Sequence, residues 1–133
     1  MWQEIKTEME LQTFMEKLHF FHDSCIKEIQ YISGAYVNAE LRMHAINDRR
    51  LLRVLVQRQC AELATLELEF GGLKYMNLMP LDETYTCEIL AAALYFQDGY
   101  IYWCDKTADD AQDAGPFESM LICAERLRWR PTA

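Results

Sequence analysis

The chain has 133 residues and a mass of 15.7 kDa, and 51% of its residues are hydrophobic and 12% aromatic. This composition excludes a disordered or collagen-like chain and predicts one domain, residues 1–133, with its own core. The 21 Asp and Glu residues outnumber the 13 Lys and Arg residues, so the formal net charge is −8. Because phosphate groups attract positive charge, we expect neither nucleic acid nor an anionic membrane as a partner.

The sequence also bears on the compartment in which the protein works. The longest uncharged, strongly apolar run covers residues 89–96, far short of the roughly 20 residues that span a bilayer as a helix. The first ten residues carry three Glu and lack the basic and apolar regions of a signal peptide. Five cysteines occur without a CxxC motif, so we expect reduced, structural thiols. Together these features predict a cytoplasmic protein.

One helix is predicted near the start of the chain. Thr7 and Glu10 have the spacing of a capping box, in which each side chain bonds the backbone amide of the other residue. Apolar residues then follow at i, i+3, i+4 and i+7, which places them on one helical face. These are Leu11, Phe14, Met15 and Leu18. The pattern predicts an amphipathic helix over residues 8–18.

Beyond the helix the apolar period changes from 3.6 to 2, which is typical of strands. The clearest alternation covers residues 65–70, where apolar side chains alternate with Glu67 and Glu69. Asp98-Gly99 lies between two apolar segments, and Asp-Gly favours a hairpin turn because its residues accept positive φ. The segments predicted as strands are 26–37, 51–59, 65–70 with a continuation over 73–78, 87–96, 100–104 and 120–129.

The order of these elements indicates the fold class. Nothing alternates strand with helix as a doubly wound sheet does. We therefore predict an α+β fold, with the N-terminal amphipathic helix packed on a curved, mostly antiparallel sheet or a partly closed barrel of six to seven strands, the β-rich part covering residues 26–130. Residues 38–50 form a polar connection with a turn signal at Asn47-Asp48. Residues 105–115 hold four Asp and one Lys, which predicts a mobile acidic loop.

Charge is distributed unevenly along the chain. Residues 42–58 hold five Arg and one Asp, whereas residues 62–118 hold twelve acidic residues and two Lys. One interpretation is that Glu67 and Glu69 face Arg residues on neighbouring strands in solvated ladders, each pair contributing about 0.2–1 kcal/mol. The other is an acidic surface, centred on the 105–115 loop, that steers a basic protein partner. The loop carboxylates assigned to that surface are Asp109, Asp110 and Asp113.

No catalytic motif is present, so attention falls on a small polar cluster after the helix. The sequence matches no Gly-rich phosphate loop, GxSxG elbow, HExxH zinc motif or EF-hand. His19, His22 and Asp23 form a His-x-x-His-Asp group. Two imidazoles and a carboxylate can bind a metal or contact a partner. Alternatively, His22 and Asp23 form a turn in which Asp23 caps the backbone.

A second cluster is aromatic. Tyr100, Tyr102 and Trp103 lie within one predicted strand. Aromatic side chains on a strand fill a core or line a barrel mouth, and at a rim they form a binding face. A nucleophilic role for Cys104 is not expected, because the neighbouring Asp105 carboxylate disfavours the thiolate.

Three short stretches carry a resemblance to known proteins. They are Phe21-His22-Asp23-Ser24, residues 66–73 with the sequence LELEFGGL, and residues 124–127 with the sequence AERL. In this order they resemble a group of small uncharacterised bacterial proteins, some of which are similar to immunity proteins of polymorphic toxin systems. The resemblance implies a cytoplasmic, non-enzymatic protein that binds a partner protein, and it brings no catalytic residues.

Two hypotheses about function follow. The first is a non-enzymatic interaction module that needs no cofactor or metal and binds a protein partner, or a second copy of itself through a strand edge or an aromatic face. The residues assigned to its binding surface are His22, Asp23, Tyr100, Tyr102, Trp103 and the three Asp of the acidic loop.

The second hypothesis is a small-ligand-binding or hydrolytic domain that uses a barrel interior. It requires His22, Asp23 and Glu125 to converge there. Glu125 is included because a regular strand would place it on the same buried face as Cys123 and Leu127. The observation that separates the hypotheses is whether these three side chains share one cavity or lie more than roughly 10 Å apart, beyond the reach of catalytic contacts.

Overall fold

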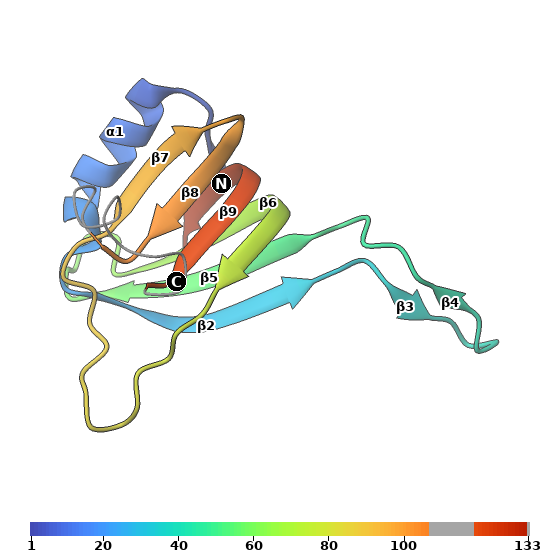
Figure 1. The fold of residues 1–133 in the computed structure, drawn as a ribbon. Coiled ribbons are helices and arrows are strands. Elements are labelled where there is room, and N and C mark those ends of the chain that lie inside the picture. The colour runs from blue at the N-terminus through green and yellow to red at the C-terminus, as the bar shows by residue number, and fades with distance from the viewer. Residues whose placement is uncertain (107–118, 133) are drawn as a thin grey trace.

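The computed structural model describes residues 1–106 and 119–132. Within them lie one α-helix, one short 3-10 helix and nine strands, of which seven form the main sheet (Figure 1). The elements in chain order are β1 (Gln3–Ile5), α1 (Glu8–Lys17), η1 (His19–Phe21), β2 (Ser24–Ile32), β3 (Tyr36–Val37), β4 (Met43–His44), β5 (Leu51–Arg58), β6 (Thr65–Asn77), β7 (Ala93–Gln97), β8 (Tyr100–Cys104) and β9 (Leu121–Pro131).

The main sheet is antiparallel and is not closed into a barrel. Its strand order is β2-β5-β6-β9-β8-β7, with β1 also paired to β9. Strand β9 pairs with β8 through residues 121–124 and with β1 through residues 127–129, so β1 and β8 follow one another along the same side of β9. The predicted α+β class with a mostly antiparallel sheet is confirmed, and the predicted Asp98-Gly99 turn joins β7 to β8.

Helix α1 begins where the sequence predicts. The Thr7 hydroxyl accepts from the Glu10 amide at 3.1 Å, and the Thr7 amide donates to the Glu10 carboxylate at 3.1 Å. Phe14 is buried, and its ring centroid lies 5.0 Å from that of Trp129 on β9. The helix thereby covers one face of the sheet (Figure 1). The three-residue strand β1, too short for a pattern to predict, precedes it. Among the described residues, no helix is long and apolar enough to cross a membrane.

A sharp bend interrupts both central strands, β6 and β9. In a regular strand, side chains alternate between faces, but here Gly71 and Gly72 separate two core positions of β6, Phe70 and Leu73. Gly72 adopts a φ of +63°, a conformation that glycine reaches without steric cost.

The facing residues of β9 follow the same bend. Glu125 and Arg126 both point to solvent, between the buried side chains of Ala124 and Leu127. The expectation that Glu125 is buried with Cys123 and Leu127 is therefore wrong, because the strand changes face at the bend. The Glu125 and Arg126 side chains instead lie over Gly72 and Gly71, where a Cβ atom would collide with them.

Charged side chains on β5, β6 and β9 form the predicted ladder, although one member is far less solvated than expected. Glu69 is 5% exposed, and its carboxylate lies 2.6 Å from Arg128 and 3.5 Å from Arg53. The Trp2 ring stacks on the guanidinium groups of Arg128 and Arg130 at 4.3 Å each. The Glu67 and Glu69 carboxylates are therefore paired with Arg53, Arg128 and Arg130 within the sheet and offer little free charge to a partner.

Three connections differ from the sequence prediction. The predicted strand 26–37 ends at Ile32, and the polar connection 38–50 contains the short hairpin β3–β4. Most of the predicted strand 87–96 lies outside the sheet, because only residues from Ala93 onward pair with β8. Residues 107–118, which hold Asp109, Asp110 and Asp113 of the acidic loop, lie outside the described residues.

Replacing the glycine at the bend tests this account of the two central strands. Gly72→Ala is expected to lower the free energy of unfolding by about 2 kcal/mol or more, because it adds both strain at positive φ and a collision with Glu125. Gly99→Ala is the matched control, because Gly99 also has positive φ, at +82°, but has no atom near its Cβ position. Gly99→Ala should lower the free energy of unfolding, measured by urea denaturation, by about 1 kcal/mol. Equal losses in the two variants would contradict the packing at the bend.

Candidate protein-interaction site

Residues 33–50 form an arm that projects from the body of the protein (Figure 1). It continues from β2 and β5 and contains the antiparallel pair β3–β4, in which Tyr36 faces His44 and Val37 faces Met43. Strand β6 pairs with β5 only up to Phe70 opposite Leu52. Past that point β6 still reaches the root of the arm through the bond from the Leu73 amide to the Arg50 carbonyl, and farther out β3 and β4 form a separate two-stranded sheet.

Hydrogen bonds hold the arm at its root. The Ser33 carbonyl accepts from the amides of Arg49 and Arg50 at 3.0 and 3.1 Å. On the other side, the Arg50 carbonyl accepts from the Leu73 amide at 2.8 Å, which ties the root to the bend in β6. Gly34 has a φ of +102°, and a side chain there would collide with the Asp48 carboxylate. The arm therefore leaves the body in a defined direction.

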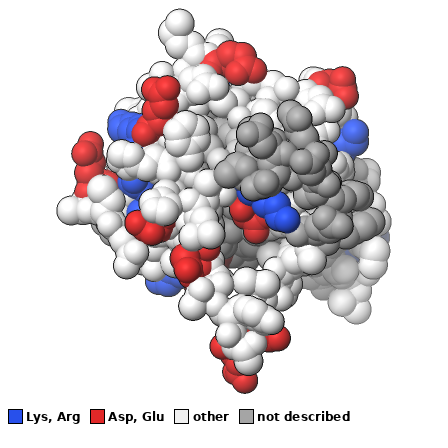
Figure 2. Space-filling view, turned by 60° about the vertical axis from the view of Figure 1, so that its left-hand side comes forward, with Lys and Arg blue, Asp and Glu red and all other residues white. Residues whose placement is uncertain are grey.

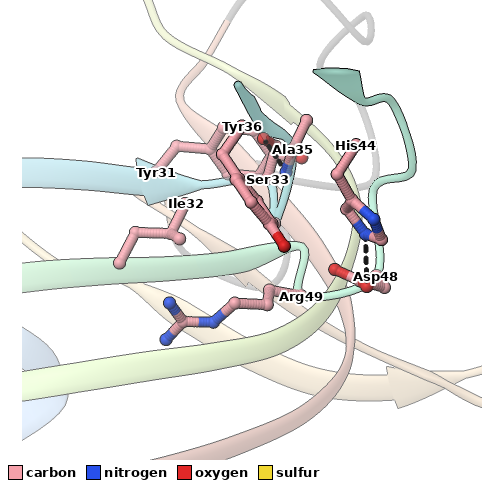
Figure 3. Close-up of a pocket in the computed structure, with 9 residues that line it drawn as sticks. Tyr31, Ile32, Ser33, Ala35, Tyr36, His44, Asp48 and Arg49 are labelled. Atoms are coloured by element: carbon pink, nitrogen blue, oxygen red, sulfur yellow. Dashed lines mark hydrogen bonds and ion pairs between the residues drawn. The ribbon is translucent and has the colours of Figure 1, made fainter. Parts of the chain in front are cut away.

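A second set of contacts orders the hairpin of the arm (Figure 3). The Tyr36 and His44 rings stack with centroids 5.1 Å apart, and His44 Nε2 lies 3.0 Å from the Asp48 carboxylate. These side chains, together with Tyr31 and Arg49, line an open hollow of about 820 Å³ at the root. The hollow offers aromatic surface and one guanidinium group to a docking segment.

The tip of the arm is a capped turn with an unusual residue. Asn38 Oδ1 accepts from the amides of Glu40 and Arg42, both at 3.0 Å. Leu41 between them has a φ of +63° and is 85% exposed. Positive φ costs a bulky residue roughly 1–2 kcal/mol relative to right-handed backbone, and glycine or asparagine adopts it far more readily. Folding alone therefore gives no reason for leucine at this position.

Apolar side chains along the arm are exposed to solvent in the single chain. A soluble protein rarely exposes contiguous apolar surface without a partner for it. The exposed members on the arm, with exposures between 52% and 85%, are Tyr36, Val37, Leu41, Met43 and Ile46. We call this set the arm surface.

A second apolar surface lies on the body, beside strand β2. The connection 78–92 and β2 enclose an open groove of about 400 Å³, and Asp105, whose pKa burial raises, lies in its lining. The apolar side chains that line it are Ile26, Ile29, Leu78, Met79, Pro80, Leu81, Ile89 and Met120. Several remain exposed, including Leu78 at 53% and Leu81 at 59%. We call this the body groove.

The body groove lies in an acidic region. Residues 78–92 contain Asp82, Glu83 and Glu88 and no Lys or Arg. In the face of Figure 2, the projection at the lower end of the molecule shows acidic and no basic side chains. A basic and apolar segment is the matching occupant for such a surface.

The structure places His22 and Asp23 in a turn. The His22 Nδ1 atom lies 2.7 Å from the Leu90 carbonyl oxygen, and His22 Nε2 lies 3.5 Å from the Asp23 carboxylate. Both side chains are more than half exposed. Their backbone joins β2 to Ile89, because the Asp23 amide donates to the Ile89 carbonyl at 3.1 Å. Among the described residues, no three His, Cys, Asp or Glu side chains lie close enough together to hold a metal ion.

Glu125 does not join His22 and Asp23. It lies 3.4 Å from Arg50, just before β5, whereas Asp23 precedes Ser24, which pairs with Arg58 at the far end of β5. Eight residues of extended strand separate the two ends by about 25 Å. The convergence that the hydrolytic hypothesis requires is therefore absent from this arrangement of the three residues.

The aromatic cluster is divided between two faces of the sheet. Trp103 is 1% exposed and packs edge-on against Phe21 at 5.7 Å, so it belongs to the core and not to a binding surface. Tyr102 lies on the opposite face and stacks on Tyr95 at 5.1 Å. A hydrogen bond with Cys123, together with burial, raises the pKa of Tyr102. Tyr100 lies beneath Lys74, whose ammonium group is 4.2 Å from the ring centroid.

Sequence reasoning missed the arm because residues 38–50 are mostly polar. The signal was present in Leu41, Met43 and Ile46, which are apolar residues at near-regular spacing within a polar stretch. A protein-interaction segment and a plain loop have similar sequences, and only the exposure of these side chains in the structure distinguishes them.

Comparison of the chain with protein-family models, with curated proteins and with solved structures finds no match.

Removing the stack at the root tests whether the arm is ordered by its own contacts. His44→Ala should leave the melting temperature of the body unchanged, because the arm adds nothing to the core. Hydrogen exchange of the amides in residues 36–44 should accelerate at least tenfold, because the variant loses both the Tyr36 stack and the Asp48 hydrogen bond. Arg42→Ala, an exposed change on the same hairpin, should alter the exchange rates little. Unchanged exchange in His44→Ala would show that other contacts order the arm.

Proposed function

We propose that the protein is a non-enzymatic protein-interaction module whose arm surface docks into a partner protein. The observation that carries the proposal is Leu41, an 85% exposed leucine at positive φ at the tip of the arm. Backbone strain of this kind persists at functional sites, where the side chain contributes more to binding than it costs in folding. An apolar anchor with a neighbouring charge, here Arg42, is a common form of interface contact.

The contacts at the root and tip support the same role. A flexible loop loses conformational entropy when it binds, which weakens the complex. In the arm, the Asn38 cap, the Ser33 carbonyl and the His44–Asp48 pair already fix the backbone. An arm ordered before binding presents its apolar side chains at a smaller entropic cost.

The charge of the chain supports a basic partner, and the resemblance to immunity proteins implies that the chain binds a partner protein in the cytoplasm. The net charge of −8 attracts a cationic protein over long distances and accelerates its association. The arm then contributes the short-range apolar contact. In this proposal His22 and Asp23, which lie at the far end of β5 from the arm, carry no catalysis, and neither do Tyr100 and Tyr102.

Site-specific photo-cross-linking tests whether the arm contacts a protein. A photoreactive amino acid at position 41 or 43 should yield a protein adduct of defined mass in cells. The same residue at position 12 or 16, on exposed parts of α1, should yield none. Equal labelling from arm and helix positions would contradict a role for the arm.

The leucine at the tip can be separated from the stability of the fold. Leu41→Asn should leave the free energy of unfolding unchanged or raise it by up to about 1 kcal/mol, because asparagine accepts the left-handed conformation. The same change should weaken partner binding at least tenfold, because the apolar anchor is lost. Leu41→Met retains an apolar side chain and should bind nearly as the natural sequence does. Full binding by Leu41→Asn, measured by titration, would refute the proposed anchor.

A further inference from the structure

We propose that the partner of the arm is a second copy of this chain, and that each arm lies in the body groove of the other copy. This inference rests on the proposed function, since it names the protein into which the arm docks. It differs in the source of the attraction: a copy of this chain also carries a net charge of −8, so the opposite charges that meet are those of the arm and of the groove, not those of the whole chains. The result is a dimer with two equivalent contacts related by a twofold axis. A reciprocal exchange of this kind closes on itself and leaves no free arm.

The two surfaces match in apolar character. The arm surface offers five exposed apolar side chains, and the body groove offers an apolar lining with a cavity of about 400 Å³. That volume lies in the range of pockets that take up several side chains. A stable protein interface buries about 1,600 Å² in total, and in a reciprocal dimer two equivalent contacts would share that area.

They also match in charge. Residues 33–50 contain Arg42, Arg49 and Arg50 against Glu40 and Asp48, so the arm is weakly basic in a strongly acidic chain. Arg42 lies beside Leu41 at the tip with its side chain 81% exposed, and its Nε atom lies 3.8 Å from the Glu40 carboxylate. The charged side chains that line the groove are Glu28, Glu88 and Asp105 against Lys27, so the lining is acidic on balance. Bringing tip and groove together pairs opposite charges around an apolar centre.

An arm cannot fill the groove of its own chain in this geometry. The arm and the 78–92 connection project in different directions from the body (Figure 1). Folding the arm back would break the bonds from the Arg49 and Arg50 amides to the Ser33 carbonyl and the bond from the Leu73 amide to Arg50. A second copy satisfies both surfaces without changing either.

Direct pairing of two β2 edges is a less favourable way to form a dimer. Strand β2 is an edge strand of the sheet. Its register against β5 shifts between Ile26 and Glu28, which leaves Lys27 in a bulge. Bulges and charged side chains on an edge hinder the addition of another strand. The groove beside β2 therefore suits a docked arm better than an added strand.

The experiment uses sedimentation of the purified full chain and of two complementary variants. The natural sequence should sediment as a dimer, with twice the 15.7 kDa of the chain. The arm variant carries Leu41→Asp and Met43→Asp, and the groove variant carries Leu78→Lys and Leu81→Lys. Each variant alone should weaken dimerisation at least tenfold. All four side chains are more than half exposed, so the fold should survive, as circular dichroism would verify.

Mixing the two variants gives the decisive measurement. The intact arm of the groove variant can enter the intact groove of the arm variant, so the mixture should form a heterodimer although neither variant associates strongly alone. A dimer made by arm-to-arm contact would not be restored, because only one variant retains its arm surface. Gln12→Asp with Glu16→Lys on α1 is the matched control and should remain dimeric.

The outcomes separate this inference from the proposed function. A monomeric natural chain at about 100 µM, together with an adduct of another protein at position 41, would overturn the self-association and retain the interaction module. A monomeric chain without any adduct at position 41 would overturn both. Homodimers that persist in the arm variant, or no heterodimer on mixing, would likewise refute arm exchange.

Discussion

The bend shared by β6 and β9 determines where the sheet ends and where the arm begins. Up to Phe70, β6 lies beside β5 and the three strands β2, β5 and β6 form one surface. At Gly72 the chain adopts positive φ, and β6 turns away with β9 still paired to it. Strands β2 and β5 end one residue pair later, at Ile32 opposite Leu51, and residues 33–50 continue from them as the arm. The projecting arm is a consequence of this separation.

The same bend also fixes the direction of the arm. Leu73, the first core residue after the two glycines, donates its amide to the Arg50 carbonyl. The Arg50 guanidinium lies 3.4 Å from the Glu125 carboxylate on β9. The sequence predicted Glu125 as a buried carboxylate that needs a charged partner. In the structure its side chain is exposed and pairs with Arg50. A solvent-exposed ion pair of this kind contributes little energy, yet it lies where the body and the arm meet.

The parts of the fold that the sequence predicted are those set by local physics. The Thr7–Glu10 capping box, the alternation over 65–70 and the Asp98-Gly99 turn each depend on residues close together in the chain. The face of Glu125 and the burial of Trp103 depend instead on distant partners. A bend at two glycines changes the face of every later residue on that strand and on its neighbour, and no periodicity within β9 reveals it.

The candidate site was harder to predict because the polar composition of the arm and the exposed leucine at its tip indicate different roles. Polar composition over 38–50 agrees with a loop, and the Asn38 cap agrees with a tight turn. Leucine at the left-handed position of that turn, with 85% of its surface exposed, agrees with neither. Other apolar residues at positive φ, such as Phe21 and Leu63, pack in or against the core, whereas Leu41 is exposed, and this difference points to a constraint outside the single chain. Under the proposed function, the strain at Leu41 is present in the free protein and is offset by the apolar contact that this side chain makes in the complex.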